Sequence, residues 1–149
     1  MCLITEQKRA KVAVEDIPCY KVLTYQRSQL KSPYQDFVYE VGKLYKVKFT
    51  IVRNHSDGVR FCSADNVATD AYENWKVGSR WKKGTIAIEH GFHSCKEADR
   101  ALVSCDSTVK FERCALVTCT IPKGAHYYED VTGLLCSNQI IINEIVEVL

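Results

Sequence analysis

The stretch from Gly84 to Asp130 limits the fold most strongly, because it holds two strand-like runs, a helix-like segment and a tight turn in close succession. Residues alternate between two faces from Thr85 to Ser94, which is the period of a half-buried strand, and Gly91 breaks this run. The segment Cys114–Ile121 is rich in small and β-branched residues on both faces, as in a strand covered on most of both sides. Pro122 and Gly124 then predict a turn.

A short helix is predicted from Cys95 to Ser104. The preceding Ser94 and the following Glu97 form a capping-box pattern, which marks a helix start. The helix would bury Ala98, Ala101 and Leu102 at helical spacing. Two to three turns are too few for an isolated helix, so packing against a sheet must stabilise it.

The rest of the chain reads mainly as strands. The predicted strands are Pro18–Tyr25, a run over Phe37–Tyr45 interrupted by Gly42, Val47–Ile51, and Ser137–Leu149 with a bend at Asn143-Glu144. A second helix is predicted over Asp65–Lys76. Because strands and helices do not alternate, we expect one α+β domain over residues 1–149. It would have a mostly antiparallel twisted sheet of six or seven strands and one or two short helices.

Composition excludes several classes of protein. A net charge of +2 without a run of lysine or arginine gives no strong nucleic-acid signal. The sequence has no apolar run of about 20 residues and no signal-peptide pattern, so we expect no membrane association and a cytoplasmic location. The eight cysteines are then expected to be reduced, and the lack of a CxxC spacing argues against a zinc ribbon.

The histidine-rich turn offers two kinds of chemistry. His90, His93 and Cys95 are metal-binding residue types, but a structural zinc site needs four ligands, so no metal is predicted. Cys95 could instead be a nucleophile activated by His93 or His126, since the first turn of a helix lowers a thiol pKa. A cysteine-dependent hydrolase therefore stays open as a function.

Two other segments leave alternatives open. Removal of Met1 would make Cys2 an N-terminal nucleophile, and the sequence does not tell whether that happens. The segment Trp75–Gly84 interleaves tryptophans with basic residues, which could stack a base. A loop or hairpin whose tryptophans cover the edge of the core is the preferred interpretation.

The order of motifs resembles a family of uncharacterised phage and bacterial domains. The resemblance rests on the phrases FVYEVGKLYKV and EHGFHSCKEADRAL followed by a strand, and it covers Pro18 to Leu149. The family label implies a phage or bacterial origin and an accessory role, and it gives no activity.

More remotely, the chain is similar to the ADP-ribosyltransferase fold. The matching segments are Tyr20-Lys21, Gly91-Phe92-His93-Ser94, Leu116–Gly124 and Asn138–Ile142. The resemblance implies a cleft that binds NAD or a related nucleotide. Its candidate ligand-binding residues are Tyr20, Lys21, His93, Ser94, Gln139 and Glu144.

Two departures from that family's pattern weigh against activity. Lys21 stands where arginine or histidine is expected, and lysine has no planar fork. Gln139 stands where the catalytic glutamate would fall, and Glu144 would replace it only after a shift of register. We therefore expect a non-catalytic binding protein, with a nucleotide or a protein as partner. An NAD-dependent ADP-ribosyltransferase is the first alternative.

Overall fold

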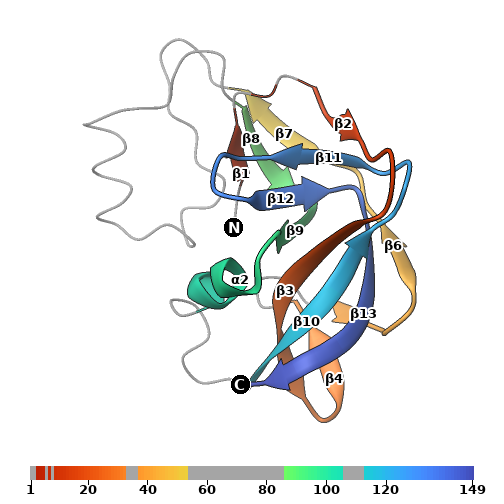
Figure 1. The fold of residues 1–149 in the computed structure, drawn as a ribbon, viewed down its shortest axis with the longest axis vertical. Helices are drawn as coiled ribbons and strands as arrows, with labels where there is room; N and C mark the ends of the chain where they lie inside the picture. Colours follow the sequence, from red (N-terminus) through yellow and green to blue (C-terminus); the bar gives the residue numbers. More distant parts are fainter. Residues whose placement is uncertain (1–2, 6, 8, 33–36, 54–85, 106–112) are drawn as a thin grey trace, which may run out of the picture.

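The computed structural model describes the chain except for residues 1–2, 6, 8, 33–36, 54–85 and 106–112. The elements are β1 Leu3–Thr5, β2 Lys11–Val12, β3 Ile17–Gln26, β4 Gln29–Lys31, β5 Val38–Tyr39, β6 Leu44–Lys46, β7 Thr50–Arg53, β8 Ile86–His90, β9 Phe92–Cys95, α2 Ala98–Cys105, β10 Cys114–Ile121, β11 His126–Glu129, β12 Leu134–Ser137 and β13 Gln139–Val148. Two antiparallel sheets result (Figure 1). The smaller has the order β1-β8-β7. The larger has the order β2-β11-β12-β9-β3-β10-β13-β6, with β4 also paired to β3 and β5 paired to β4.

The sheets confirm an α+β chain with mostly antiparallel strands and a short helix, but the expectation of six or seven strands is wrong. The larger sheet alone has ten strands. Strands β2 and β5 have two residues each, and β1, β4 and β6 have three. Strands this short contain too few residues to show an alternating pattern. No helix in the described part of the chain has the length and apolar character to cross a bilayer.

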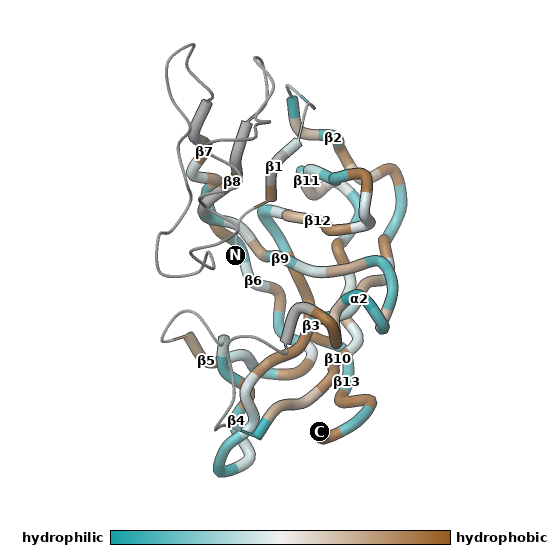
Figure 2. The backbone as a smooth tube through the Cα atoms, turned by 90° about the vertical axis from the view of Figure 1, so that its left-hand side faces the viewer, coloured by the Kyte–Doolittle hydropathy of each residue, from teal (hydrophilic) through white to brown (hydrophobic). Residues whose placement is uncertain are grey.

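Strand β10 forms the centre of the larger sheet, because it pairs with β3 on one side and β13 on the other. The predicted strand Cys114–Ile121 is confirmed at both ends, and the predicted strand Pro18–Tyr25 gains one residue at each end. Leu23 of β3 lies opposite Ala115 of β10, and both are fully buried. We call this side of β3, β10 and β13 the inner face. Figure 2 shows the hydrophobic character of these three strands.

The larger sheet curls back on itself. Strands β12 and β13 have three strands between them in the sheet, which would separate them by about 19 Å if the sheet were flat. Their ends, Ser137 and Gln139, are only two residues apart, which is at most about 7 Å. Asn138 stabilises this corner with three hydrogen bonds. Its backbone N–H donates to the His126 carbonyl at 3.0 Å, and its side-chain Oδ1 accepts from the His126 N–H at 2.9 Å. Its backbone carbonyl accepts from the Val47 N–H at 2.9 Å.

Two β-bulges decide which side chains of β13 face inward. The register with β10 skips Asn143 and Val146, so each is an extra residue without a directly opposed partner. The inward positions therefore run from Ile142 to Ile145 to Val148, three residues apart rather than two. The bend predicted beside Asn143 coincides with the first bulge.

Gly91 divides the predicted strand over Thr85–Ser94 into two strands that belong to different sheets. A Cβ atom at Gly91 would lie 2.3 Å from the Cys136 sulfur and 3.1 Å from the Phe49 ring. Only glycine allows this approach, because real Cβ atoms do not come so close to other atoms. The smaller sheet packs here on the larger one through a cluster of buried side chains: Leu3, Ile88, Tyr128 and Cys136.

Helix α2 begins three residues later than the predicted start at Cys95. The residues before Ala98 are bonded to strand β12 and the turn before it instead. Cys95 pairs with Leu134, and the Lys96 N–H donates to the Gly133 carbonyl at 3.0 Å. Ser94 therefore lies inside β9 and does not start the helix. The predicted helix face is confirmed, and it packs against β3 and β10 with Ala98, Ala101 and Leu102.

One predicted strand is only partly confirmed, and three other predictions lie outside the described residues. The strand over Val47–Ile51 is wrong in its first part, since β7 covers only its end and the Val47 N–H bonds to the corner described above. The helix over Asp65–Lys76, the segment Trp75–Gly84 and Cys2 lie outside the described residues.

Replacing Gly91 with alanine should destabilise the protein by about 1–3 kcal/mol, because the new Cβ would overlap the Cys136 sulfur. Urea unfolding followed by circular dichroism measures the change. The cost should be smaller in a Cys136→Ala background, where the sulfur is absent. An equal cost in both backgrounds would contradict the packing at this strand switch.

Candidate functional site

Lys21 lies on the inner face of β3, between Cys19 and Leu23 and opposite Val117 of β10. All three neighbours are at most 1% exposed. The side chain keeps some exposed area, whereas its charged end is enclosed by protein, and this burial lowers the Lys21 pKa. No carboxylate among the described residues forms an ion pair with it. Lys21 is therefore an interior lysine for which the described residues supply no acidic partner.

The position of Lys21 follows from a break in the sheet. Strands β3 and β9 form a single pair, Tyr20 with Cys95, and their ladder ends there. The Lys21 ammonium donates a hydrogen bond to the backbone carbonyl of His93 on β9. The Lys21 side chain thus replaces the backbone N–H that β3 would provide if its ladder with β9 continued. The His93 carbonyl therefore has a hydrogen-bond donor.

The thiol of Cys19 lies on the inner face near Ser94 and Lys21. Cys19 is directly opposite Cys119 on β10. Its pKa is lowered by the Cys119 thiol first, and then by the Ser94 hydroxyl, the Lys21 ammonium and the Ile121 N–H, which together outweigh burial. Burial raises the pKa of Cys119 instead. Sequence reasoning missed this pair, although both cysteines occupy inward positions of strands that were predicted correctly.

Two polar atoms beside Lys21 are buried without a partner of good geometry among the described residues. They are the hydroxyl oxygen of Ser94, a residue 3% exposed, and the Nε2 atom of His93. The Ser94 hydroxyl is near enough to polarise the Cys19 thiol without making a well-formed hydrogen bond. Burial, with the nearby Lys21 charge, lowers the His93 pKa to about 3. His93 is therefore a neutral imidazole at neutral pH.

Cys95 does not have the environment expected of a nucleophile. It ends strand β9 instead of lying in the first turn of a helix, so the helix dipole does not act on it. Burial raises the Cys95 pKa to about 11, which makes the expectation of a lowered pKa wrong. Cys136 behaves in the same way, with a pKa raised to about 12.

The structure brings together three of the six predicted ligand-binding residues: Lys21, His93 and Ser94. Tyr20 lies on the opposite face of β3, where it packs against helix α2. Glu144 is exposed and shares that outer face, since Thr118 lies opposite both Tyr20 and Glu144. Gln139 pairs with Lys46 at the start of β13.

The histidines of the predicted metal pattern are separated. His90 ends β8 in the smaller sheet, where its Nδ1 lies 3.0 Å from the Thr50 hydroxyl, whereas His93 is on β9 in the larger sheet. Within the described part of the chain, no group of three or more histidine, cysteine or acidic side chains is placed to hold a metal ion.

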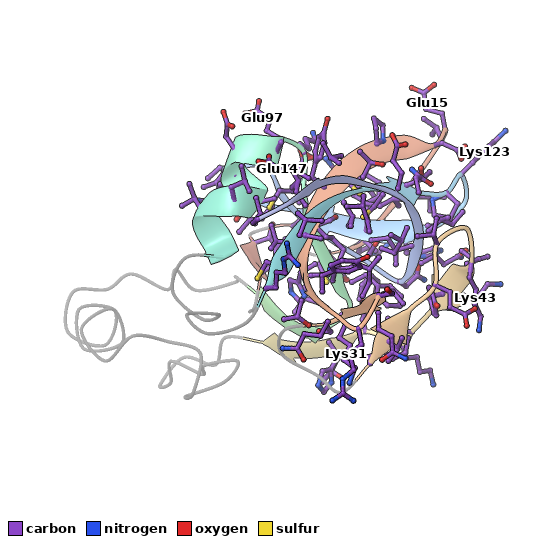
Figure 3. The ribbon with its side chains drawn as sticks, turned by 90° about the horizontal axis from the view of Figure 1, so that it is seen from below. Glu15, Lys31, Lys43, Glu97, Lys123 and Glu147 are labelled. Atoms are coloured by element: carbon purple, nitrogen blue, oxygen red, sulfur yellow. The ribbon has the colours of Figure 1, made fainter. Side chains whose placement is uncertain are left out.

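The second candidate feature is an open sheet edge that sequence reasoning also missed. Strand β6 pairs with β13 only over Gln139–Ile141. From Asn143 to Val148, β13 has β10 on one side and no strand on the other among the described residues. Ile145, Val146 and Val148 are 37%, 53% and 40% exposed along this edge. Figure 3 labels Glu147, which is exposed on the same strand.

The neutral state of His93, whose Nε2 atom is buried, predicts a specific loss of stability in acid. Its folded pKa of about 3 lies below the usual 6.5, so the unfolded chain binds the extra proton and stability is lost as pH falls below 6.5. From about pH 7 to about pH 5, the unfolding free energy should fall roughly 2 kcal/mol more in the native chain than in His93→Gln. Urea titrations of both proteins across this range measure the difference. Parallel pH profiles would show that His93 is accessible to protons in the folded state.

Comparisons of the chain with protein-family models, with curated proteins and with solved structures found no match. The resemblances to phage and bacterial domains and to the ADP-ribosyltransferase fold therefore stay predictions. Two features of this chain can carry a function: the interior Lys21 with its neighbouring thiols, and the edge of β13 that has no strand partner among the described residues.

Proposed function

We propose that this chain is a non-catalytic binding protein that takes an extended segment of a protein partner as an added strand along the open edge of β13. One observation carries the proposal: over Asn143–Val148, β13 has a paired side and a side without a partner in the described structure. Unpaired N–H and C=O groups on a strand edge bind an incoming strand readily.

The side chains along the edge define the chemistry of the partner. Ile145 and Val148 are on the inner face but stay more than one third exposed, so a partner strand would cover them with apolar side chains. Glu144 and Glu147 are exposed and lie opposite Thr118 and Leu116, on the outer face. A strand that alternates apolar with basic residues would complement both faces.

Charge makes a second copy of this chain a poorer partner. An antiparallel pair of two β13 edges would gather the glutamates of both copies, Glu144 and Glu147, along one short ladder. Like charges on neighbouring strands are destabilising. The bulges at Asn143 and Val146 also twist the edge, which disfavours open-ended stacking of identical strands.

The sequence-based alternatives have less support from the geometry. The charged end of Lys21 is bonded inside the sheet to His93, and Tyr20 and Glu144 lie on the other face, so the residues proposed for NAD do not form one group. The cysteine-dependent hydrolase lacks a Cys95 thiol of low pKa. An accessory role in a phage or bacterial cell follows from the resemblance alone.

Binding at the edge can be tested with a short fluorescent peptide of alternating valine and lysine. Fluorescence anisotropy should show binding to the native chain, and hydrogen exchange should slow at the amides of Asn143–Val148. Val146→Lys should weaken binding at least about fivefold, because it sets a positive charge against the peptide. The matched control Val131→Lys carries the same change on a fully exposed turn residue and should bind as the native chain does.

Two results would overturn the proposal. One is equal binding by the Val146→Lys and Val131→Lys proteins. The other is equal binding of a peptide with glutamate in place of lysine, since the edge glutamates would then play no part. Labelled NAD provides a separate check: transfer or hydrolysis would favour the transferase, and a thermal shift without turnover would favour a nucleotide-binding protein. We expect neither signal.

A further inference from the structure

We propose that Cys19 and Cys119 form a redox modification site, in which Cys19 reacts with a peroxide and Cys119 then closes a reversible disulfide across the β3–β10 ladder. This inference is independent of the open edge of β13. It rests on the placement of the two thiols and on the polar groups around them.

The two cysteines are placed for a bond. They are directly opposed in the antiparallel register of β3 and β10. Opposed Cα atoms in such a ladder lie about 4.5–5.5 Å apart. A disulfide spans Cα separations of about 4.4–6.8 Å, so the backbone needs no large movement. Both side chains also point to the same face, as opposed residues of a sheet do.

The groups around Cys19 stabilise a thiolate. The Cys119 thiol, the Ser94 hydroxyl and the Ile121 N–H lie near enough to its sulfur to lower the Cys19 pKa. The Ser94 hydroxyl has no partner of good geometry among the described residues, and Ser94 is 3% exposed, so its O–H is free to turn towards a Cys19 thiolate. The thiolate is the reactive form of cysteine.

Lys21 supplies a positive charge near Cys19. Its ammonium lies close enough to stabilise a negative charge on Cys19, and no carboxylate of the described chain pairs with it. Its side chain keeps some exposed area on the face that holds Cys19 two residues away. Cys19 itself is 1% exposed, so only a small oxidant such as hydrogen peroxide would reach the sulfur.

The chemistry proceeds in two balanced steps. The Cys19 thiolate attacks one oxygen of hydrogen peroxide, the O–O bond breaks, and sulfenic acid and hydroxide form. The Cys119 sulfur then attacks the Cys19 sulfur, the S–OH bond breaks, and water leaves with the thiol proton. Peroxide is reduced by two electrons and the two thiols are oxidised to one disulfide.

The experiment uses the full chain, reduced and then treated with hydrogen peroxide before the remaining thiols are blocked. Peptide mapping under non-reducing conditions should find the Cys19 peptide joined to the Cys119 peptide, and a thiol reductant should release them. In Cys119→Ser, a sulfenic-acid probe such as dimedone should label Cys19. Cys136 is the internal control, because it is equally buried, and there burial outweighs the nearby Lys21 charge and raises the Cys136 pKa to about 12.

The Lys21→Met variant tests the cation. It keeps the length of the side chain and removes the charge, so oxidation of Cys19 should slow by about tenfold because less of the thiol is ionised. If this variant does not fold, Ser94→Ala removes a donor and should slow the same reaction. The proposal is overturned if Cys19 is oxidised no faster than Cys136, if it pairs mainly with another cysteine, or if neither folded variant changes its rate.

Discussion

The enclosed ammonium of Lys21 is the constraint on which the interior depends. Burying a charge costs several kcal/mol unless its hydrogen bonds and neighbours compensate. Here the compensation comes from the His93 carbonyl and from the thiols on the surrounding strands, and not from a carboxylate of the described chain. The same charge helps to keep His93 neutral and helps to lower the pKa of Cys19. The Lys21 charge thus adds to burial at His93 and to the Cys119 thiol at Cys19, which are the larger causes of the two pKa shifts.

Lys21 and the edge of β13 are connected by one row of directly opposed residues that crosses three neighbouring strands. Lys21 lies opposite Val117 on β10, and Val117 lies opposite Ile145 on β13. Along this row, exposure is nil at Val117 and reaches 37% at Ile145, so the inner face opens towards solvent at the edge. A strand added along β13 would cover Ile145. Partner binding would therefore also shield the row that holds the lysine, which gives the two features a physical connection.

The sequence predicts elements whose residue pattern is local. It does not predict features that depend on how two distant strands align. The runs at Cys114–Ile121 and Pro18–Tyr25, and the break at Gly91, are visible because their patterns are local. That Cys19 faces Cys119 depends on how two distant strands align, which no single segment specifies.

The start of helix α2 was misplaced because a strand pair competes for Cys95. Of the candidate site, proximity of Lys21 to His93 and Ser94 was expected, and the thiol environment was not.

The most direct test of this account is the ionisation of Lys21 in the folded protein. Nuclear magnetic resonance of lysine side chains labelled at the ε-carbon, with Lys21→Met to assign the signal, follows each amine through a pH titration. We predict that Lys21 titrates below the usual value of 10.5, apart from the surface lysines, because its charged end is enclosed. A Lys21 signal that titrates together with the exposed lysines would contradict the enclosed cation and the thiol chemistry inferred from it.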